Sequence, residues 1–111
     1  MKLFDTIILA EADKFIGKLD RKSTKKLFFV IRNAEQNLDP KFFKKLRKEI
    51  WEFKVKYADR QIRVLAFWDK TEKSKTLVIA TNGFYKKTQK TPISEIERAD
   101  RIRTKYFDNK K

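Results

Sequence analysis

Residues 49–57 read EIWEFKVKY, and residues 61–68 read QIRVLAFW. In the first stretch apolar and charged residues alternate, a period of two that is typical of a strand with one buried face. One side of this strand would carry Trp51, Phe53, Val55 and Tyr57, and the other Glu52, Lys54 and Lys56. The second stretch is almost wholly apolar apart from Arg63, which predicts a central strand covered on both faces. The intervening ADR predicts a tight turn, so the two stretches form an antiparallel hairpin.

The rest of the chain adds strands and helices on both sides of this hairpin. TLVIATNGF, residues 76–84, predicts a third strand that completes a meander, and residues 2–9 predict a first strand. Apolar residues at helical spacing predict a helix within residues 10–20 and a second over residues 20–38, capped by Ser23 or Thr24. Pro40 is expected to open a short helical turn. A last helix is expected over residues 93–107, with its inner stripe beginning at Ile93.

The predicted architecture is therefore an α+β fold. An N-terminal strand and a helical hairpin would pack on a twisted, mainly antiparallel sheet, and a C-terminal helix would follow. A length of 111 residues predicts a single domain over residues 1–111, with a frayed tail at residues 108–111.

Net charge is the strongest compositional signal. The chain has 29 Lys and Arg against 15 Asp and Glu, a net charge of +14, which favours polyanionic partners such as nucleic acid. It has no cysteine and no histidine, so disulfides, cysteine zinc sites and the usual neutral-pH base are excluded, and no metal or cofactor is expected. No apolar run approaches the roughly 20 residues that span a bilayer. We expect a soluble, cytoplasmic protein without a membrane role.

Charged residues of the hairpin form the first candidate site. Glu52, Lys54 and Lys56 share one strand face, and Arg63 should lie opposite or diagonal to one of the two lysines. A wet face is the ordinary explanation for the first three. A cation in an apolar central strand must find a counter-charge or a cleft, and Glu52 is the simplest partner for Arg63.

A second candidate is FYKK at residues 84–87, which follows the third strand. Lys86 and Lys87 have an ordinary reading as a solvated loop, but ligand groups also gather where strands end. Tyr85 offers a flat face for a base and a hydroxyl that can donate. Together with the hairpin charges, this set would hold phosphate and move protons without metal or histidine.

Spaced motifs over about the last sixty residues resemble the RelE/ParE toxin superfamily, and within it the HigB-like, phage-derived branch. The resemblance rests on Leu46, Ile50, Trp51, Glu52, Phe53 and Lys54, then Arg63, Val64 and Leu65, then Phe84, Lys86, Lys87, Thr88, Lys90, Thr91, Pro92 and Glu95. It implies a RelE-like fold, similar to small microbial ribonucleases. It also implies a toxin of a type II toxin–antitoxin pair that cleaves mRNA on the ribosome and is silenced by an antitoxin, commonly a helix-turn-helix, HigA-like protein. Some relatives use a cleft histidine that this chain lacks.

For RNA cleavage we predict that Arg63 clamps the phosphate, and that Lys54 and Lys86 stabilise charge or transfer protons. Glu52 would act as the base or orient Arg63. Tyr85 would stack on a base or supply a proton. The predicted RNA-binding residues are Lys56, Arg60, Lys87, Lys90, Arg47 and Lys48. Two alternatives stay open: a ParE-like inhibitor of DNA gyrase, and a non-catalytic basic RNA-binding module.

Overall fold

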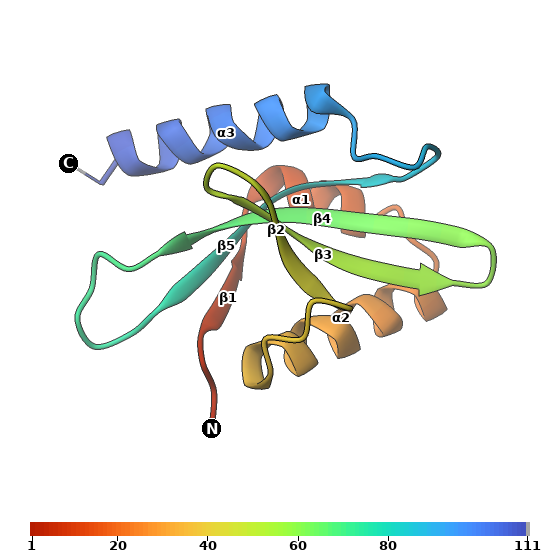
Figure 1. Ribbon diagram of the computed structural model, residues 1–111, viewed down its shortest axis with the longest axis horizontal. Helices are drawn as coiled ribbons and strands as arrows, with labels where there is room; N and C mark the ends of the chain where they lie inside the picture. The colour runs from red at the N-terminus through yellow and green to blue at the C-terminus, as the bar shows by residue number, and fades with distance from the viewer. Residues whose placement is uncertain (111) are drawn as a thin grey trace.

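The computed structural model describes residues 1–110 and is built around one five-stranded sheet with three helices (Figure 1). In chain order the elements are β1 (Asp5–Ile8), α1 (Ala10–Ile16), α2 (Arg21–Gln36), β2 (Phe43–Arg47), β3 (Ile50–Tyr57), β4 (Arg60–Asp69), β5 (Leu77–Tyr85) and α3 (Ile93–Asp108). This order confirms the predicted α+β class, with a mainly antiparallel sheet and a C-terminal helix.

The sheet has the strand order β1-β5-β4-β3-β2, which places β4 at its centre. β4 pairs antiparallel with β3 and β5, as the meander prediction requires, and β1 pairs parallel with β5. In the hairpin Lys54 lies directly opposite Arg63. The two-residue turn begins at Ala58, whose φ of 56° is the left-handed conformation that short hairpin turns often need.

Helices cover both faces of the sheet: α2 lies on one side and α3 on the other (Figure 1). The buried residues of α1, Ala12 and Ile16, share a core with those of α2, so α1 covers the same face as α2. The face under α1 and α2 is packed with Phe53, Val55, Ile62 and Val64, and the face under α3 with Leu65, Phe67 and Ile79. Because β4 is buried on both faces, a charge on it such as that of Arg63 is forced into a low-dielectric setting.

The predicted boundaries of the second helix need two corrections. Its cap is Asp20, whose Oδ1 accepts a hydrogen bond of 2.7 Å from the backbone N–H of Ser23, so neither Ser23 nor Thr24 is the cap. A carboxylate at this position also interacts favourably with the positive end of the helix dipole. The helix ends at Gln36, two residues before its predicted end, and Leu38 is 49% exposed.

The helical turn predicted after Pro40 is followed by a strand that the sequence reading missed. The backbone N–H groups of Phe42 and Phe43 both donate to the Asp39 carbonyl, which makes the turn, but residues 43–47 then pair with β3. The ring of Phe43 stacks on that of Phe53 with centroids 4.4 Å apart. Burial of these two rings outweighs the local helical pattern of FKKLR.

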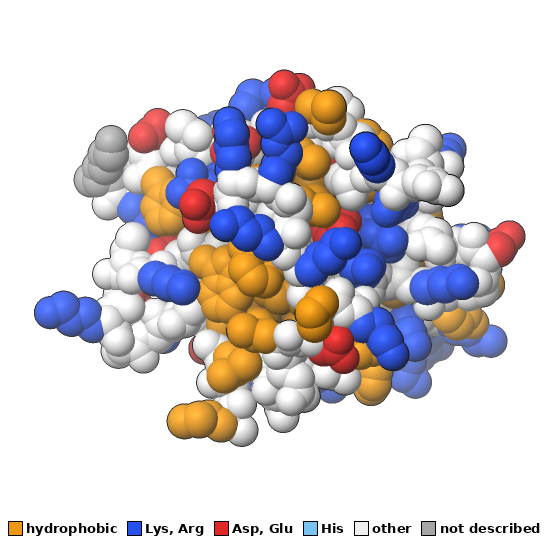
Figure 2. All heavy atoms as spheres, in the orientation of Figure 1, with side chains coloured by type: hydrophobic (Ala, Val, Ile, Leu, Met, Phe, Trp, Pro, Cys, Tyr) orange, Lys and Arg blue, Asp and Glu red, His pale blue; other side chains and the backbone are white. Residues whose placement is uncertain are grey.

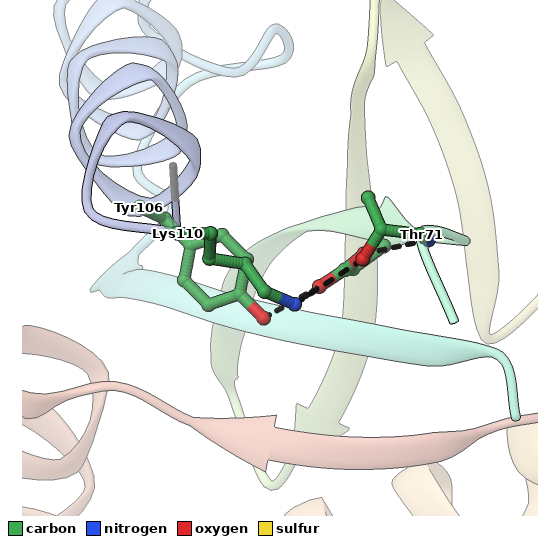
Figure 3. A network of polar contacts seen from close by, with 4 residues as sticks. Thr71, Tyr106 and Lys110 are labelled. Atoms are coloured by element: carbon green, nitrogen blue, oxygen red, sulfur yellow. Dashed lines mark hydrogen bonds and ion pairs between the residues drawn. The ribbon is translucent and has the colours of Figure 1, made fainter.

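Both ends of α3 are fastened to the sheet. At its start, the side chain of Asn82 donates to the Glu95 carboxylate at 3.0 Å. At its end, Tyr106 and Lys110 bond to Asp69 (Figure 3). Lys110 thus has a partner on the sheet, while the expected fraying of residues 108–111 stays a prediction; Lys111 lies outside the described residues. The predicted inner position of Ile93 is wrong, because this residue is 61% exposed.

Candidate functional site

A hollow of about 390 Å³ opens beside the outer half of β3. Here β3 has lost its neighbour, because β2 pairs only as far as Phe53 and the chain leaves the sheet at Phe42. The hollow takes its walls from α2, the turn before β2, and the β3–β4 hairpin. It is lined by Lys26, Val30, Lys41, Phe42, Lys54, Val55, Lys56, Gln61 and Arg63.

Cations dominate this region of the surface. Figure 2 shows a dense group of Lys and Arg side chains to the right of β2, between α3 and the β3–β4 hairpin. Five of the nine residues that line the hollow are Lys or Arg, and none is acidic. The lining therefore suits an anionic ligand.

Arg63 and Glu52 form a buried ion pair beneath the hollow. The Arg63 Nε atom lies 3.4 Å from Glu52 Oε1, and the side chains are 6% and 2% exposed. Arg63 Nη2 donates to Gln61 Oε1 at 3.0 Å, and Nη1 donates to the Ile62 carbonyl at 3.1 Å. Thr91 Oγ1 donates to the same Glu52 oxygen at 3.0 Å. The face of Glu52, Lys54 and Lys56 is therefore not a simple wet face, since Glu52 is buried.

The hydrogen-bonding capacity of Arg63 is only partly used. Within residues 1–110 its Nε hydrogen meets no hydrogen-bond acceptor, because the ion pair with Glu52 is poorly aligned. Burial lowers the pKa of Arg63, and the charge of Glu52 raises it. The guanidinium still carries its proton at any physiological pH, so it supplies a fixed positive charge with spare N–H donors.

Lys54 has the electrostatic setting of a proton-transfer group. Burial lowers its pKa, and the positive charges of Lys44, Arg63 and Lys86 lower it further, against a raising effect of Glu52. The crowding of cations thus makes the neutral amine of Lys54 available at lower pH than for an ordinary lysine.

Lys86 lies close enough to Lys54 to affect its pKa, as the sequence reading required. Its backbone N–H donates to the Gln61 carbonyl at 2.7 Å, which fixes the start of the loop after β5 against the hairpin. Gln61 lines this hollow and two more, of about 650 Å³ and 530 Å³, beyond it. The three hollows therefore adjoin one another at Gln61. We call them together the cationic track, because nine Lys or Arg side chains line them, against the two carboxylates of Asp20 and Asp59.

Tyr85 lies on the other face of the sheet from Arg63, so the structure does not bring these two predicted catalytic residues together. Its strand partner is Ile62, and its ring packs edge-on against Phe15 of α1 with centroids 5.5 Å apart. Phe15 lies against Gly83, where there is no room for a Cβ atom. Tyr85, 38% exposed, lines the 650 Å³ hollow, where it can contact a ligand but not the groups around Lys54.

The predicted RNA-binding residues lie in four different places. Lys56 lines the first hollow, and Arg60 and Lys87 line the hollow of Tyr85. Arg60 is also paired with Asp20 at 2.8 Å, which neutralises part of its charge. Lys90 is exposed on the loop before α3 and lines none of the three hollows.

Arg47 and Lys48 lie elsewhere, in the turn between β2 and β3. They line a separate hollow of about 310 Å³ against α3, together with Glu97 and Asp100. Six positions separate Lys48 from Lys54, roughly 20 Å in an extended strand. The two acidic residues balance the two basic ones in this hollow, and the structure does not bring Arg47 and Lys48 together with the cations around Lys54.

Sequence reasoning missed four residues around the first hollow: Lys26, Lys41, Gln61 and Thr91. Lys26 and Lys41 come from α2 and the following turn, and only the packing of α2 under β3 brings them there. Gln61 had a local signal, because it shares its strand face with Arg63 at a spacing of two. Thr91 belonged to the resemblance motif but had no assigned role.

No cluster of His, Cys, Asp and Glu suited to a metal ion occurs among residues 1–110. In the same part of the chain, no helix combines the length and apolar character needed to cross a membrane.

By its fold and its candidate site, the protein is a small, basic α+β protein with a cation-lined track at the edge of its sheet. A family comparison refines it: residues 14–104 match the Gp49-like family of phage-derived proteins (DUF891). The chain belongs to this family, which groups RelE-like proteins of toxin type and so implies an antitoxin partner. The match bears out the predicted superfamily, but not its HigB branch. No curated protein matches the chain.

Proposed function

We propose that this protein is the toxin of a toxin–antitoxin pair and cleaves mRNA on the ribosome in the cytoplasm. The observation that carries the proposal is the buried, under-coordinated Arg63 beside Lys54 at the base of a hollow lined by further cations. A ribose–phosphate backbone is the ligand that matches an elongated cationic track with spare guanidinium donors.

Cleavage would proceed by attack of the ribose 2′-oxygen on the adjacent phosphorus. The P–O5′ bond breaks as the O2′–P bond forms, which leaves a 2′,3′-cyclic phosphate on one product and a 5′-hydroxyl on the other. One group must accept the 2′-OH proton, another must stabilise the charge on phosphorus, and a third must protonate the departing 5′-oxygen.

Arg63 serves in this scheme as the phosphate clamp, since its charge is permanent and its free N–H groups lie beside the hollow. Lys54 accepts the 2′-OH proton, because its lowered pKa makes the neutral amine accessible. Lys86, from the neighbouring loop, protonates the 5′-oxygen or balances its charge. Glu52 orients Arg63 instead of acting as the base, since it is buried and held by Thr91.

The ribosome would supply what the isolated chain lacks. Without a histidine, the protein has no side chain whose ordinary pKa lies near neutrality. A bound mRNA held in a fixed, bent geometry would reduce the barrier by several kcal/mol through orientation alone, on the order of what positioning contributes in other enzymes.

The test is cleavage of ribosome-bound mRNA by Arg63→Ala, with transcript 5′ ends mapped by primer extension. We expect the rate to fall about 100- to 1000-fold, the range seen when one donor to a developing anion is lost. Because Arg63→Ala leaves the Glu52 carboxylate buried and unpaired, the variant Arg63→Ala/Glu52→Gln is measured beside it, and circular dichroism establishes the folded fraction of both.

Arg32→Ala, an exposed arginine on α2, is the matched control and should cleave like the original protein. Cleavage by a folded Arg63→Ala/Glu52→Gln variant at the original rate would refute the clamp. Loss of DNA supercoiling by gyrase, with intact transcripts, would support the ParE-like alternative, and RNA binding without either effect would support a non-catalytic module.

A further inference from the structure

A second surface lies next to the cationic track and is apolar at its centre. Its groove, of about 470 Å³, is lined by Lys22, Lys25, Lys26, Phe29 and Tyr57, and we call it the Phe29 groove. Phe29 is 57% exposed on the outer side of α2, and Tyr57 ends β3 on the same side of the sheet. Lys26 lines both the Phe29 groove and the first hollow, so the two are continuous.

The cations around the Phe29 groove occupy an unfavourable place in their own helix. α2 has no acidic residue in its first turn, and Arg21 and Lys22 lie there, against the positive end of the helix dipole. Lys25 and Lys26 follow at once, and only the cap Asp20 offsets them. An acidic ligand would relieve this repulsion, which gives the groove a charge preference that its apolar floor alone would not have.

The geometry of Phe29 favours an aliphatic side chain over a nucleobase. The ammonium of Lys26 lies over the Phe29 ring, 5.7 Å from its centroid, and so covers one face of the ring. A nucleobase therefore has only the other face of this ring for stacking, whereas a leucine-like side chain needs no open ring face and matches the mainly apolar walls of the groove.

We propose that the Phe29 groove docks an acidic peptide segment of the antitoxin through one large apolar side chain. Carboxylates on either side of this anchor would then pair with Lys22, Lys25 and Lys26. Because Lys26 joins the groove to the first hollow, the segment extends toward Lys54 and excludes RNA from it. The inhibitory consequence rests on the proposed function, whereas the docking itself does not.

Two synthetic peptides test the docking on the full chain. One consists of alternating glutamate and serine with a central pair of leucines, and the other has serine in place of the leucines. Fluorescence anisotropy should show the leucine peptide binding about tenfold more tightly, a difference of about 1.4 kcal/mol. Phe29→Ala should abolish this preference, and Leu38→Ala, at a comparably exposed apolar residue just beyond the end of α2, should keep it.

Several outcomes would overturn the proposal. One is equal affinity of the original protein for the two peptides, and another is a leucine preference that survives in Phe29→Ala. A third is a Phe29→Ala variant that loses affinity for an oligouridylate while keeping the leucine preference, since the groove would then belong to the RNA site. If the original protein prefers the leucine peptide but cleaves no mRNA, the proposed function is refuted and the proposed docking surface stands.

Discussion

Two buried carboxylates on neighbouring strands are treated very differently by this fold. Asp69, at the end of β4, accepts hydrogen bonds from Tyr106 at 2.6 Å, Lys110 at 2.8 Å, and both the backbone N–H and the hydroxyl of Thr71 at 2.9 and 2.7 Å (Figure 3). Glu52, on β3, has one hydroxyl donor and a poorly aligned guanidinium.

The difference separates a structural site from the candidate functional site. Around Asp69, α3 and the β4–β5 loop supply a donor to nearly every lone pair, which fixes the end of the helix. Around Glu52, the Nε hydrogen of Arg63 is buried without an acceptor, which is costly to the fold. Arg63 also lines the hollow, where an anionic ligand can contact the rest of its guanidinium.

The largest stability effect is expected at Asp69. Asp69→Asn removes the charge and turns one acceptor into a donor that faces Lys110, so the free energy of unfolding should fall by about 3 kcal/mol. Urea denaturation measures this, with Asp13→Asn, an exposed residue of α1, as the control. The rate of RNA cleavage per folded molecule should be unchanged.

The same variant has a defined pH signature. Burial would raise the pKa of Asp69, but the hydrogen bonds from Lys110, Tyr106 and Thr71 outweigh it and hold the pKa well below its usual range. A carboxylate with a depressed pKa stabilises the fold at pH values above its unfolded-state pKa of about 4. This stabilisation is lost as the pH falls below that value. The stability gap between the original protein and Asp69→Asn should therefore narrow below about pH 4. A gap that is constant from pH 7 to pH 2 would contradict this assignment.

Lys54→Arg tests the functional side of the comparison. Arginine keeps the positive charge but cannot accept a proton at working pH, so cleavage should fall about 100-fold, equivalent to about 2.7 kcal/mol. The original protein should cleave faster as the pH rises toward the lowered pKa of Lys54, and the variant should lack this rise. Lys105→Arg, on the exposed side of α3, is the control. A variant that retains both rate and pH profile would limit Lys54 to charge stabilisation.

Gly83→Ala sharpens the distinction between the two faces of the sheet. A Cβ atom there would collide with the ring of Phe15, whose Cε2 atom is 2.8 Å away, so α1 must shift. We expect a loss of about 2 kcal/mol in unfolding free energy, measured by thermal denaturation. Gly17→Ala is the control, because its Cβ would meet only ordinary contacts of 3.5 Å or more. Since Arg63 lies on the opposite face, cleavage by the folded fraction should change little.

The smallest effect is expected at Thr91. Thr91→Val removes the hydroxyl that donates to Glu52, at a cost of about 1 kcal/mol in stability. The freed carboxylate can then align with Arg63 Nε and bind it more tightly, which should weaken binding of an oligouridylate. Thr104→Val, whose hydroxyl bonds only within α3, serves as the comparison. Unaltered RNA affinity in Thr91→Val would show that Glu52 does not regulate Arg63.

The sequence predicted the parts of the fold that depend on one local period. IWEFKVKY alternates strictly and became β3, and the pairing of Lys54 with Arg63 followed from the short turn. The segment FKKLR is compatible with both the helical and the strand period. It forms strand β2 because Phe43 stacks on Phe53, and this is a tertiary contact.

The site, too, could be predicted only where its residues lie close together in the sequence. Arg63, Lys54 and Lys56 were identified because they lie on one hairpin, whereas Lys26 enters the hollow from a helix about thirty residues earlier in the chain. Tyr85 was grouped with Lys86 from sequence adjacency, but adjacent residues of a strand point to opposite faces. The alternation that located β3 would also have separated Tyr85 from Arg63.

The parallel pairing of β1 with β5 determines when in synthesis the protein becomes competent. β1 emerges first from the ribosome, yet its partner strand ends only at Tyr85, and Lys86 comes directly after it. The sheet and the cationic track therefore stay incomplete until most of the chain has been translated. On our proposal, a ribosome that makes this protein finishes nearly the whole message before the product can attack any transcript, including its own.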